Sequence, residues 1–247
     1  MNRINGEQRF GKKPVTESTA SDTAVIVPAA RMHPPTMAHH ALITDVINRA
    51  KSVGGTAHVY LSQNKPGDEK NPLPAEHRVE MLNHAYHEHI ASGHLQFHVG
   101  SSMHANLADF HKQNPHVKHA HIVLGDDRMD VGDSLKKYNG AQDKAGKVPY
   151  KFDSLEVHQR KATPSKYDNI HATELRNKAR SGDSDAHEYF KERMHPNIPD
   201  HLVKKTIDYI RSTKATAKPV KTTKKKTVNE STLYLVIDKL KLYGKLN

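Results

Sequence analysis

The stretch TAVIVPAARMHPPTMAHHALI, residues 23–43, decides how this chain folds. It begins with a continuous apolar run, which is typical of a strand buried on both faces of a parallel sheet. Pro34 and Pro35 then favour an extended turn, because proline locks its own φ and restricts the residue before it. Thr36 follows as a candidate N-cap for a helix over residues 37–53. The stretch therefore predicts a buried strand, a turn and a helix in succession.

The same alternation of apolar runs and helical patterns continues along the chain. Further strands are expected at 57–62, 95–99, 119–125 and 151–158. Helices are expected near 75–91, 103–113, 131–139, 172–181, 184–193 and 199–212. Strands that alternate with helices form parallel sheets with helices on both faces. We therefore predict an α/β protein with a Rossmann-like five-stranded parallel sheet, followed by C-terminal helices and a basic tail.

Composition narrows the class of protein. The 247 residues include no Cys, which excludes disulfides and thiolate metal sites. No apolar stretch approaches the roughly 20 residues that a membrane span needs, and the first residues lack the apolar core of a secretory signal. We expect a cytoplasmic protein that does not act in a membrane. The twenty His residues are scattered, and no pair has a zinc-site spacing joined to further ligands, so we interpret them as surface and loop residues.

The net charge of +11 favours anionic partners. Much of it lies in the run KATAKPVKTTKKKT, which contains no acidic residue. We expect a flexible lead-in at 1–21, one domain at 22–212, a Lys/Thr-rich linker at 213–232 and a short terminal element at 233–247. Non-specific contact of the Lys-rich tail with nucleic acid is one role open to it.

Two polar clusters are predicted at one edge of the sheet. Thr36, His39 and His40 open the first helix, where outward-pointing N–H groups favour an anion. The sequence GDD follows the fourth predicted strand, and ligands in open α/β sheets bind at the carboxyl ends of the strands. Farther along, Thr173 and Arg176 share one face of a helix and offer a hydroxyl and a guanidinium to a polyphosphate.

These segments resemble the HIGH superfamily of nucleotidyltransferases, which comprises adenylyl- and cytidylyltransferases. ARMHPPTMAH (30–39) lines up with the motif G-x-F-x-P-x-(H/T)-x-G-H, and IHATELR (170–176) with I-S-x-T-x-x-R. KNPLPAEHRVEML (70–82) resembles a segment of archaeal-type nicotinamide mononucleotide adenylyltransferases. LGDDR, LKKYNG and KFDSLEV resemble phage-encoded members, which would place the protein in the host cytoplasm. The resemblance covers about residues 22–212.

The resemblance also implies a role for each matching residue. His39 would bind the α-phosphate, and Thr173 and Arg176 the β- and γ-phosphates and the leaving pyrophosphate. The other residues expected to contact the nucleotide or its phosphates are Arg31, Thr36, Gly125, Asp126 and His171, and those expected to contact the acceptor are Asn71 and Arg78. Mg²⁺ would be held mainly by the nucleotide phosphates, without protein ligands.

The sequence departs from the first motif at the two glycine positions, where it has Ala30 and Ala38, and at Met32, where Phe is usual. A Cβ at Ala38 narrows the approach of a nucleotide to the backbone. The expected reaction is transfer of a nucleoside monophosphate from ATP or CTP to a phosphorylated acceptor. Nicotinamide mononucleotide leads among the acceptors, which would be a step in NAD biosynthesis. Cytidylyl transfer, phosphopantetheine adenylylation and a degenerate binding module are alternatives, and assembly into a homo-oligomer is left open.

Overall fold

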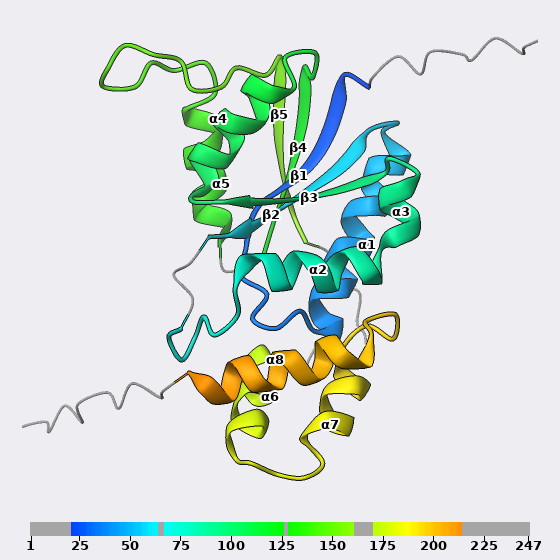
Figure 1. Ribbon diagram of the computed structural model, residues 1–247. Helices are drawn as coiled ribbons and strands as arrows, with labels where there is room; N and C mark the ends of the chain where they lie inside the picture. Colours follow the sequence, from blue (N-terminus) through cyan, green and yellow to red (C-terminus); the bar gives the residue numbers. More distant parts are fainter. Residues whose placement is uncertain (1–20, 64–66, 126–127, 161–169, 214–247) are drawn as a thin grey trace, which may run out of the picture. The chain divides into compact units, whose positions relative to one another are not determined.

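The computed structural model describes residues 21–63, 67–125, 128–160 and 170–213. Within them the chain forms one parallel sheet with the strand order β3-β2-β1-β4-β5 (Figure 1). The strands are β1 (Thr23–Ala30), β2 (Thr56–Ser62), β3 (Leu95–Gly100), β4 (His119–Leu124) and β5 (Ser154–Gln159). The predicted fold class is confirmed.

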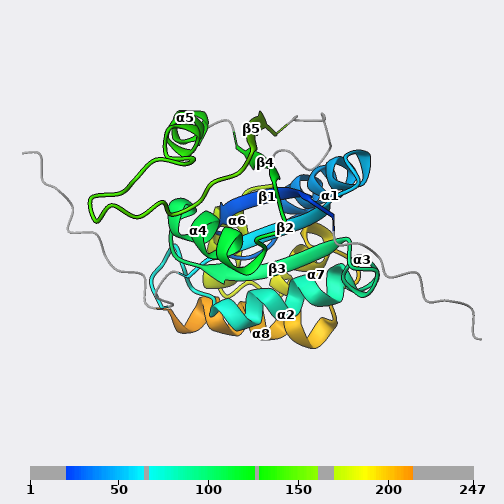
Figure 2. The ribbon, with the colours of Figure 1, turned by 90° about the horizontal axis from the view of Figure 1, so that it is seen from above.

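Helices cover both faces of the sheet (Figure 2). One face carries α1 (Met37–Ser52), α2 (Ala75–Ala85) and α3 (His87–Ala91), and the other carries α4 (Met103–Gln113) and α5 (Met129–Lys137). Three more helices pack beyond the carboxyl ends of the strands (Figure 1). They are α6 (Ala172–Arg180), α7 (Ala186–Arg193) and α8 (Asp200–Ser212).

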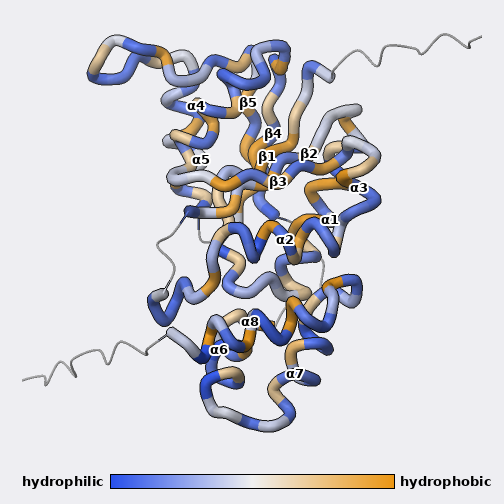
Figure 3. Tube along the Cα trace, in the orientation of Figure 1, coloured by the Kyte–Doolittle hydropathy of each residue, from blue (hydrophilic) through white to orange (hydrophobic). Residues whose placement is uncertain are grey.

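Alternation along the strands divides the core into two layers. Val25 and Val27 of β1 pack toward α1 and α2, whereas Ala24 and Ile26 pack toward α4 and α5. Successive side chains of a strand point to opposite faces, so a strand that is covered twice must be apolar at every position. Figure 3 shows the hydrophobic residues gathered along the strands of the sheet. Leu175 and Ala179 of α6 also belong to the first of these layers, the one that packs against α1 and α2.

The sheet opens between β1 and β4. The pairing of these strands ends at Ile26 and Ile122, although β1 continues to Ala30. Pro28 lies in this last part of β1 and cannot donate to a ladder, and the pairing with β2 also shifts register between Val27 and Ala30. The strand order reverses at this place, which is where open α/β sheets bind ligands.

Two predicted elements differ from the structure by more than two residues. The helix expected at 75–91 is divided at Tyr86, whose buried side chain packs in the core. The last strand begins at Ser154 rather than at 151, because Tyr150 and Phe152 are buried in the second layer before the ladder with β4 starts. No helix in the described part of the chain is long and apolar enough to cross a membrane.

The interpretation of the histidines as surface and loop residues is wrong for a group of them. Four are buried: His33, His40, His58 and His77. His40 Nδ1 lies 2.7 Å from the hydroxyl of Tyr86, and His77 Nε2 lies 2.8 Å from that of Thr206. Partners such as these let an aromatic polar ring stay in a core. Apart from Ser21 and residue 213, the predicted segments 1–21, 213–232 and 233–247 lie outside the described residues.

Candidate functional site

The predicted site residues that the structure describes lie near the carboxyl edge of the sheet. Thr36 and His39 follow β1, and Gly125 follows β4 directly. Helix α6 begins on the same side of the sheet, with His171 as its N-cap (Figure 1). Two helix N-termini, those of α1 and α6, therefore belong to this edge, and each carries unsatisfied N–H groups and a partial positive charge.

Thr36 is the N-cap of α1, as predicted, and it determines the tautomer of His39. The backbone N–H of Thr36 donates to His39 Nδ1 at 3.0 Å, and the Thr36 hydroxyl lies 2.9 Å from the same nitrogen. A nitrogen that accepts from a backbone N–H cannot carry a proton itself. The proton of the neutral ring is therefore on Nε2, which is the one hydrogen-bond donor that the side chain of His39 offers.

His39 is neutral at pH 7. Burial, and then the nearby charge of Arg160, lower its pKa from 6.5 to about 4. The side chain nevertheless remains partly exposed. The ring can thus donate a hydrogen bond to an anion without first acquiring a charge. The neighbouring His40 is buried and lies beside the hydroxyl of Tyr86. Of these two histidines, it is therefore His39 whose ring is accessible at the start of α1.

Arg176 joins the two predicted motifs. Its Nη1 donates to the backbone carbonyl of His33 at 2.7 Å, across 143 positions of sequence, and its Nη2 donates to Thr173 Oγ1 at 2.9 Å. The first bond anchors α6 to the turn after β1. The second confirms that Thr173 and Arg176 share one face of α6. The side chain of Thr173 is exposed and that of Arg176 is half-buried.

Positive charge is concentrated around Arg176. Burial lowers the pKa of Arg176, and the charges of Arg180 and Arg31 lower it further, while Glu69 and Asp68 act in the opposite direction. Like charges held this close are stabilised when an anion binds between them. Arg31 is exposed, whereas Arg180 is tied to the carbonyl of Glu69 at 2.9 Å.

The turn between β1 and α1 is conformationally unusual. Met32 has a φ of 48°, in the left-handed region that residues with a Cβ seldom occupy. Its side chain is buried in the core layer that packs against α1 and α2. Backbone in a sparsely populated conformation clusters at functional sites, where the surrounding contacts maintain it. Here the burial of Met32 and the bond from Arg176 to the neighbouring His33 supply those contacts.

The structure brings two further residues to this site that the sequence did not single out. Arg160 directly follows β5, its backbone N–H donates to the carbonyl of Leu124, and its charge acts on His39. His33 is 2% exposed, and its Nε2 has no hydrogen-bond partner among the described residues. The predicted strand ends at residue 158, and no motif in the sequence marks Arg160. Nothing in the sequence distinguishes His33 from its neighbours.

Arg78 and Asn71 are placed differently from an open acceptor site. Arg78 is completely buried and donates to the carbonyls of Arg31 at 2.6 Å and Ser62 at 2.8 Å, so it ties together the ends of β1 and β2. With no exposed surface it cannot touch a substrate in this conformation. Asn71 is bonded to the carboxylate of Asp68 in the loop before α2. The acceptor contacts expected of both residues stay predictions.

The remaining predicted residues flank the site. Gly125 is partly exposed and its carbonyl accepts from the N–H of Arg128 at 3.0 Å, which starts the turn into α5. His171 is exposed. Asp126 lies outside the described residues.

The donors at this site suit an anion. In the described part of the chain, no carboxylate hydrogen-bonds to Thr36, His39 or Arg176. Mg²⁺ requires oxygen ligands, above all carboxylates and phosphates. These residues thus fit an ion that is carried by the phosphates of a nucleotide. The neutral donor of His39, the charges around Arg176 and two helix N-termini can together bind a polyphosphate.

No family profile matches this chain, and no curated protein matches its sequence. Among solved structures it is similar to a bifunctional NMN adenylyltransferase/ADP ribose pyrophosphatase from Francisella tularensis, determined in complex with AMP and a manganese ion. That similarity has a TM-score of 0.49 and 15% identity, and it covers 91% of this chain and 56% of that one. A second structure of the same enzyme gives the same TM-score and identity, with 57% of that chain covered. This chain thus spans little more than half the length of these proteins.

Proposed function

We propose that this chain is a nucleotidyltransferase of the HIGH superfamily, which transfers the adenylyl group of ATP to nicotinamide mononucleotide and releases pyrophosphate. The observation that carries the proposal is the bond from Arg176 to the carbonyl of His33. It unites the segments 30–39 and 170–176, which resemble the two motifs of that superfamily, at the place where the strand order of the sheet reverses.

In the proposed reaction, His39 Nε2–H donates to the α-phosphate of ATP. The developing negative charge at this phosphate strengthens the bond in the transition state, which is how a preorganised donor accelerates a reaction. Thr36 holds the ring in the required tautomer. Arg176 and Thr173 bind the β- and γ-phosphates, and Arg31 adds charge at the exposed rim.

The bonds balance without a covalent enzyme intermediate. A phosphate oxygen of the acceptor attacks the α-phosphorus, and the bond from that phosphorus to the bridging oxygen of the β-phosphate breaks. The electron pair leaves with pyrophosphate, whose charge Arg176 stabilises. No proton has to be removed from an acceptor phosphate that is already ionised, so the chain requires no general base. Mg²⁺ bound through the phosphates would neutralise part of their charge.

The choice of nicotinamide mononucleotide rests on the resemblance of residues 70–82 to archaeal-type adenylyltransferases. In the structure this segment passes from the loop of Asn71 into α2, beside the ends of β1 and β2. Arg78 would act there by positioning the strand ends, and the loop in which Asn71 bonds to Asp68 lies directly before α2.

The test is pyrophosphate release by the untagged full chain in Mg²⁺, with ATP or CTP as donor. The acceptors are nicotinamide mononucleotide, phosphopantetheine and a polyol phosphate, and mass spectrometry identifies the product. We expect release with ATP and nicotinamide mononucleotide, with NAD as the second product. Release with another pair alone would retain the reaction class and replace the substrates.

Nucleotide binding without any release would contradict the proposed reaction and favour the degenerate binding module. A chain truncated after residue 213 tests whether the basic tail is needed for turnover or for binding nucleic acid. The enzyme should keep its turnover, because the residues assigned here precede the truncation. A protein that binds nucleic acid through its tail should lose that affinity, and the affinity of the full chain should fall steeply with salt.

A further inference from the structure

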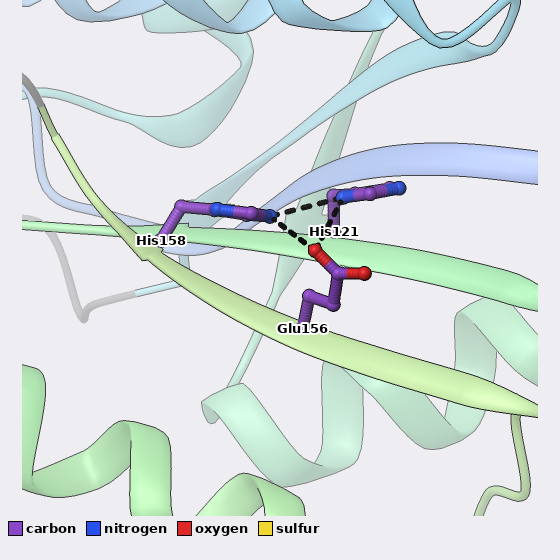
Figure 4. Close-up of side chains that lie close together, drawn as sticks. All are labelled: His121, Glu156 and His158. Carbon is purple, nitrogen blue, oxygen red and sulfur yellow. Dashed lines mark hydrogen bonds and ion pairs between the residues drawn. The ribbon is translucent and has the colours of Figure 1, made fainter.

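Three side chains on adjacent strands form a second cluster of chemically active groups (Figure 4). His121 comes from β4, and Glu156 and His158 come from the edge strand β5. The parallel register pairs His121 with Glu156 and Val123 with His158. All three side chains therefore emerge from the same face of the sheet, the one that carries α1, because residues two apart in a strand share a face.

The ligand atoms are spaced as a bound metal would require. Glu156 Oε2 lies 3.5 Å from His121 Nδ1 and 3.3 Å from His158 Nε2. Zn²⁺ with bond lengths near 2.0–2.1 Å holds its tetrahedral ligands about 3.3 Å apart. The two ring nitrogens are 2.9 Å apart, so they would separate by roughly 0.4 Å on binding. A rotation of the rings suffices for that change, since both belong to the same pair of strands.

The three side chains are partly shielded from solvent, and charges of both signs lie near them. The side chains of His121 and His158 are 16% and 22% exposed, whereas that of Glu156 is 56% exposed. Burial, and then the charge of Arg49, lower the pKa of His158, which Glu156 raises. Arg49 and Lys136 oppose a cation, and the carboxylate of Glu156 offsets part of that repulsion.

This cluster is separate from the proposed nucleotide site. His121 lies three positions before the end of β4, and none of the three residues belongs to the segments 30–39 and 170–176. The Arg residues around Arg176 favour an anion, whereas two imidazoles and a carboxylate favour a cation. The sequence did not reveal the cluster, because its ligands come from two strands that are 35 positions apart.

We propose that His121, Glu156 and His158 bind one divalent transition-metal ion, of which Zn²⁺ is the best match. Two imidazole nitrogens and one carboxylate oxygen suit Zn²⁺, Co²⁺ or Ni²⁺, whereas Mg²⁺ and Ca²⁺ prefer oxygen ligands alone. Three protein ligands leave the fourth position of a tetrahedral ion to water or another small ligand. The ion would join the edge strand β5 to β4, immediately before the segment that positions Arg160.

The test uses untagged full-length protein that has been stripped with a chelator and titrated with Zn²⁺ and, separately, with Co²⁺. The visible absorption of Co²⁺ reports its coordination directly and is independent of enzyme activity. We expect one equivalent to bind with a Kd in the micromolar range or below. His121→Gln and His158→Gln should each weaken binding by on the order of 100-fold, at least the loss that removal of an outer-shell partner causes. Glu156→Gln should weaken it as well.

Two variants serve as matched controls. His116→Gln alters an exposed histidine in the loop before β4. His98→Gln alters the pair in which His58 Nδ1 lies 3.1 Å from His98 Nε2, where no third ligand is grouped with the two rings among the described residues. Both should bind the ion like the native chain. Circular dichroism of each variant without metal checks that it folds. Glu156→Gln is the ligand variant least able to disturb folding, because it changes only an exposed side chain.

A second readout is the thermal midpoint. Zn²⁺ should raise it for the native chain and both controls, because a ligand that binds only the folded state stabilises it, and should not raise it for the three ligand variants. The proposal is overturned if the native chain binds no equivalent at about 100 µM Zn²⁺ or Co²⁺, a concentration about 100-fold above a micromolar Kd. It is equally overturned if the three ligand variants bind as tightly as the controls.

Discussion

The carboxyl edge of the sheet and the cluster on its β4–β5 face both contain histidines, but the first arrangement suits an anion and the second a cation. At the edge, His39 has a neutral ring near Arg160, and Arg31 and Arg180 lie near Arg176, an arrangement that suits an anion. On the face, ring nitrogens of His121 and His158 lie close to each other and to a carboxylate, a set of groups that suits a cation. A histidine therefore carries little functional information by itself. What its other nitrogen contacts, and which charges surround it, decide its chemistry.

The largest effect should follow from the loss of Arg176. Arg176→Ala removes the guanidinium that binds the leaving phosphates in the proposed reaction, and we expect kcat/KM to fall about 100-fold or more, as for one charge-assisted donor in a transition state. Arg176→Lys keeps the charge but loses the planar fork, so it should retain part of the activity. Steady-state kinetics measure both variants.

Binding of Co²⁺ at the β4–β5 face should be unchanged in Arg176→Ala, because the two sites share no residue. Arg193→Ala on α7, an arginine paired with Glu192, is the control and should leave kinetics unchanged. Equal activity of Arg176→Ala and the native chain would remove the reason for assigning the edge to nucleotide chemistry.

His39→Ala should be nearly as damaging, with a loss in kcat on the order of 100-fold. His39→Gln tests the tautomer argument, because its amide can replace the donor and should recover part of the rate. Activity between pH 6 and 9 should show no step caused by His39, whose pKa of about 4 keeps the ring neutral throughout. A rate that required protonated His39 would instead fall steadily above pH 4.

A moderate effect is expected on stability rather than on activity, and it comes from a buried histidine that belongs to neither site. Burial lowers the pKa of His58 to about 3, below its unfolded value of 6.5. The unfolded state then binds more protons, so stability is complete above pH 6.5 and is lost as the pH falls toward 3. Between pH 7 and 5, one such histidine should cost about 2 kcal/mol of unfolding free energy.

The measurement is denaturant unfolding at several pH values. His58→Gln has no titrating group at this position and should show a shallower loss of stability than the native chain, whereas the exposed His116→Gln should show the native slope. Parallel curves for His58→Gln and the native chain would mean that His58 contributes nothing to acid sensitivity.

The smallest effect should come from Ala38→Gly, which introduces the glycine found at this position of the motif that the sequence resembles. Removal of the Cβ lets a nucleotide approach the first turn of α1 more closely. We expect the KM for ATP to fall a few-fold, and the added backbone freedom to cost up to about 1 kcal/mol of stability. Kinetics with varied ATP concentration test this, and a raised KM would show that Ala38 already fits the nucleotide.

Strand and helix positions were largely predictable, because each is encoded by neighbouring residues. The predicted helix at 103–113 coincides with α4, and the run TAVIVPA forms most of β1. The errors occurred where tertiary contacts override local pattern. Burial of Tyr86 divides a helical pattern, and the packing of Tyr150 and Phe152 delays β5.

The site was predictable in part for the same reason. Thr36 and His39 are three residues apart and form their bond within one helical turn, as do Thr173 and Arg176. The contribution of Arg160 and the burial of His33 and Arg78 depend on chain segments that meet only in the folded protein. No local pattern encodes them.

The sequence by itself determined the class of fold, the order of its elements and the two motifs at the carboxyl edge, because hydrophobic periodicity and helix caps act over a few residues. Only the tertiary structure decided which histidine faces the site, that Arg176 closes onto His33, and that His121, Glu156 and His158 meet. These depend on strand register and on packing between segments far apart in the chain. Such contacts arise from the free energy of the whole core rather than from any one stretch of sequence.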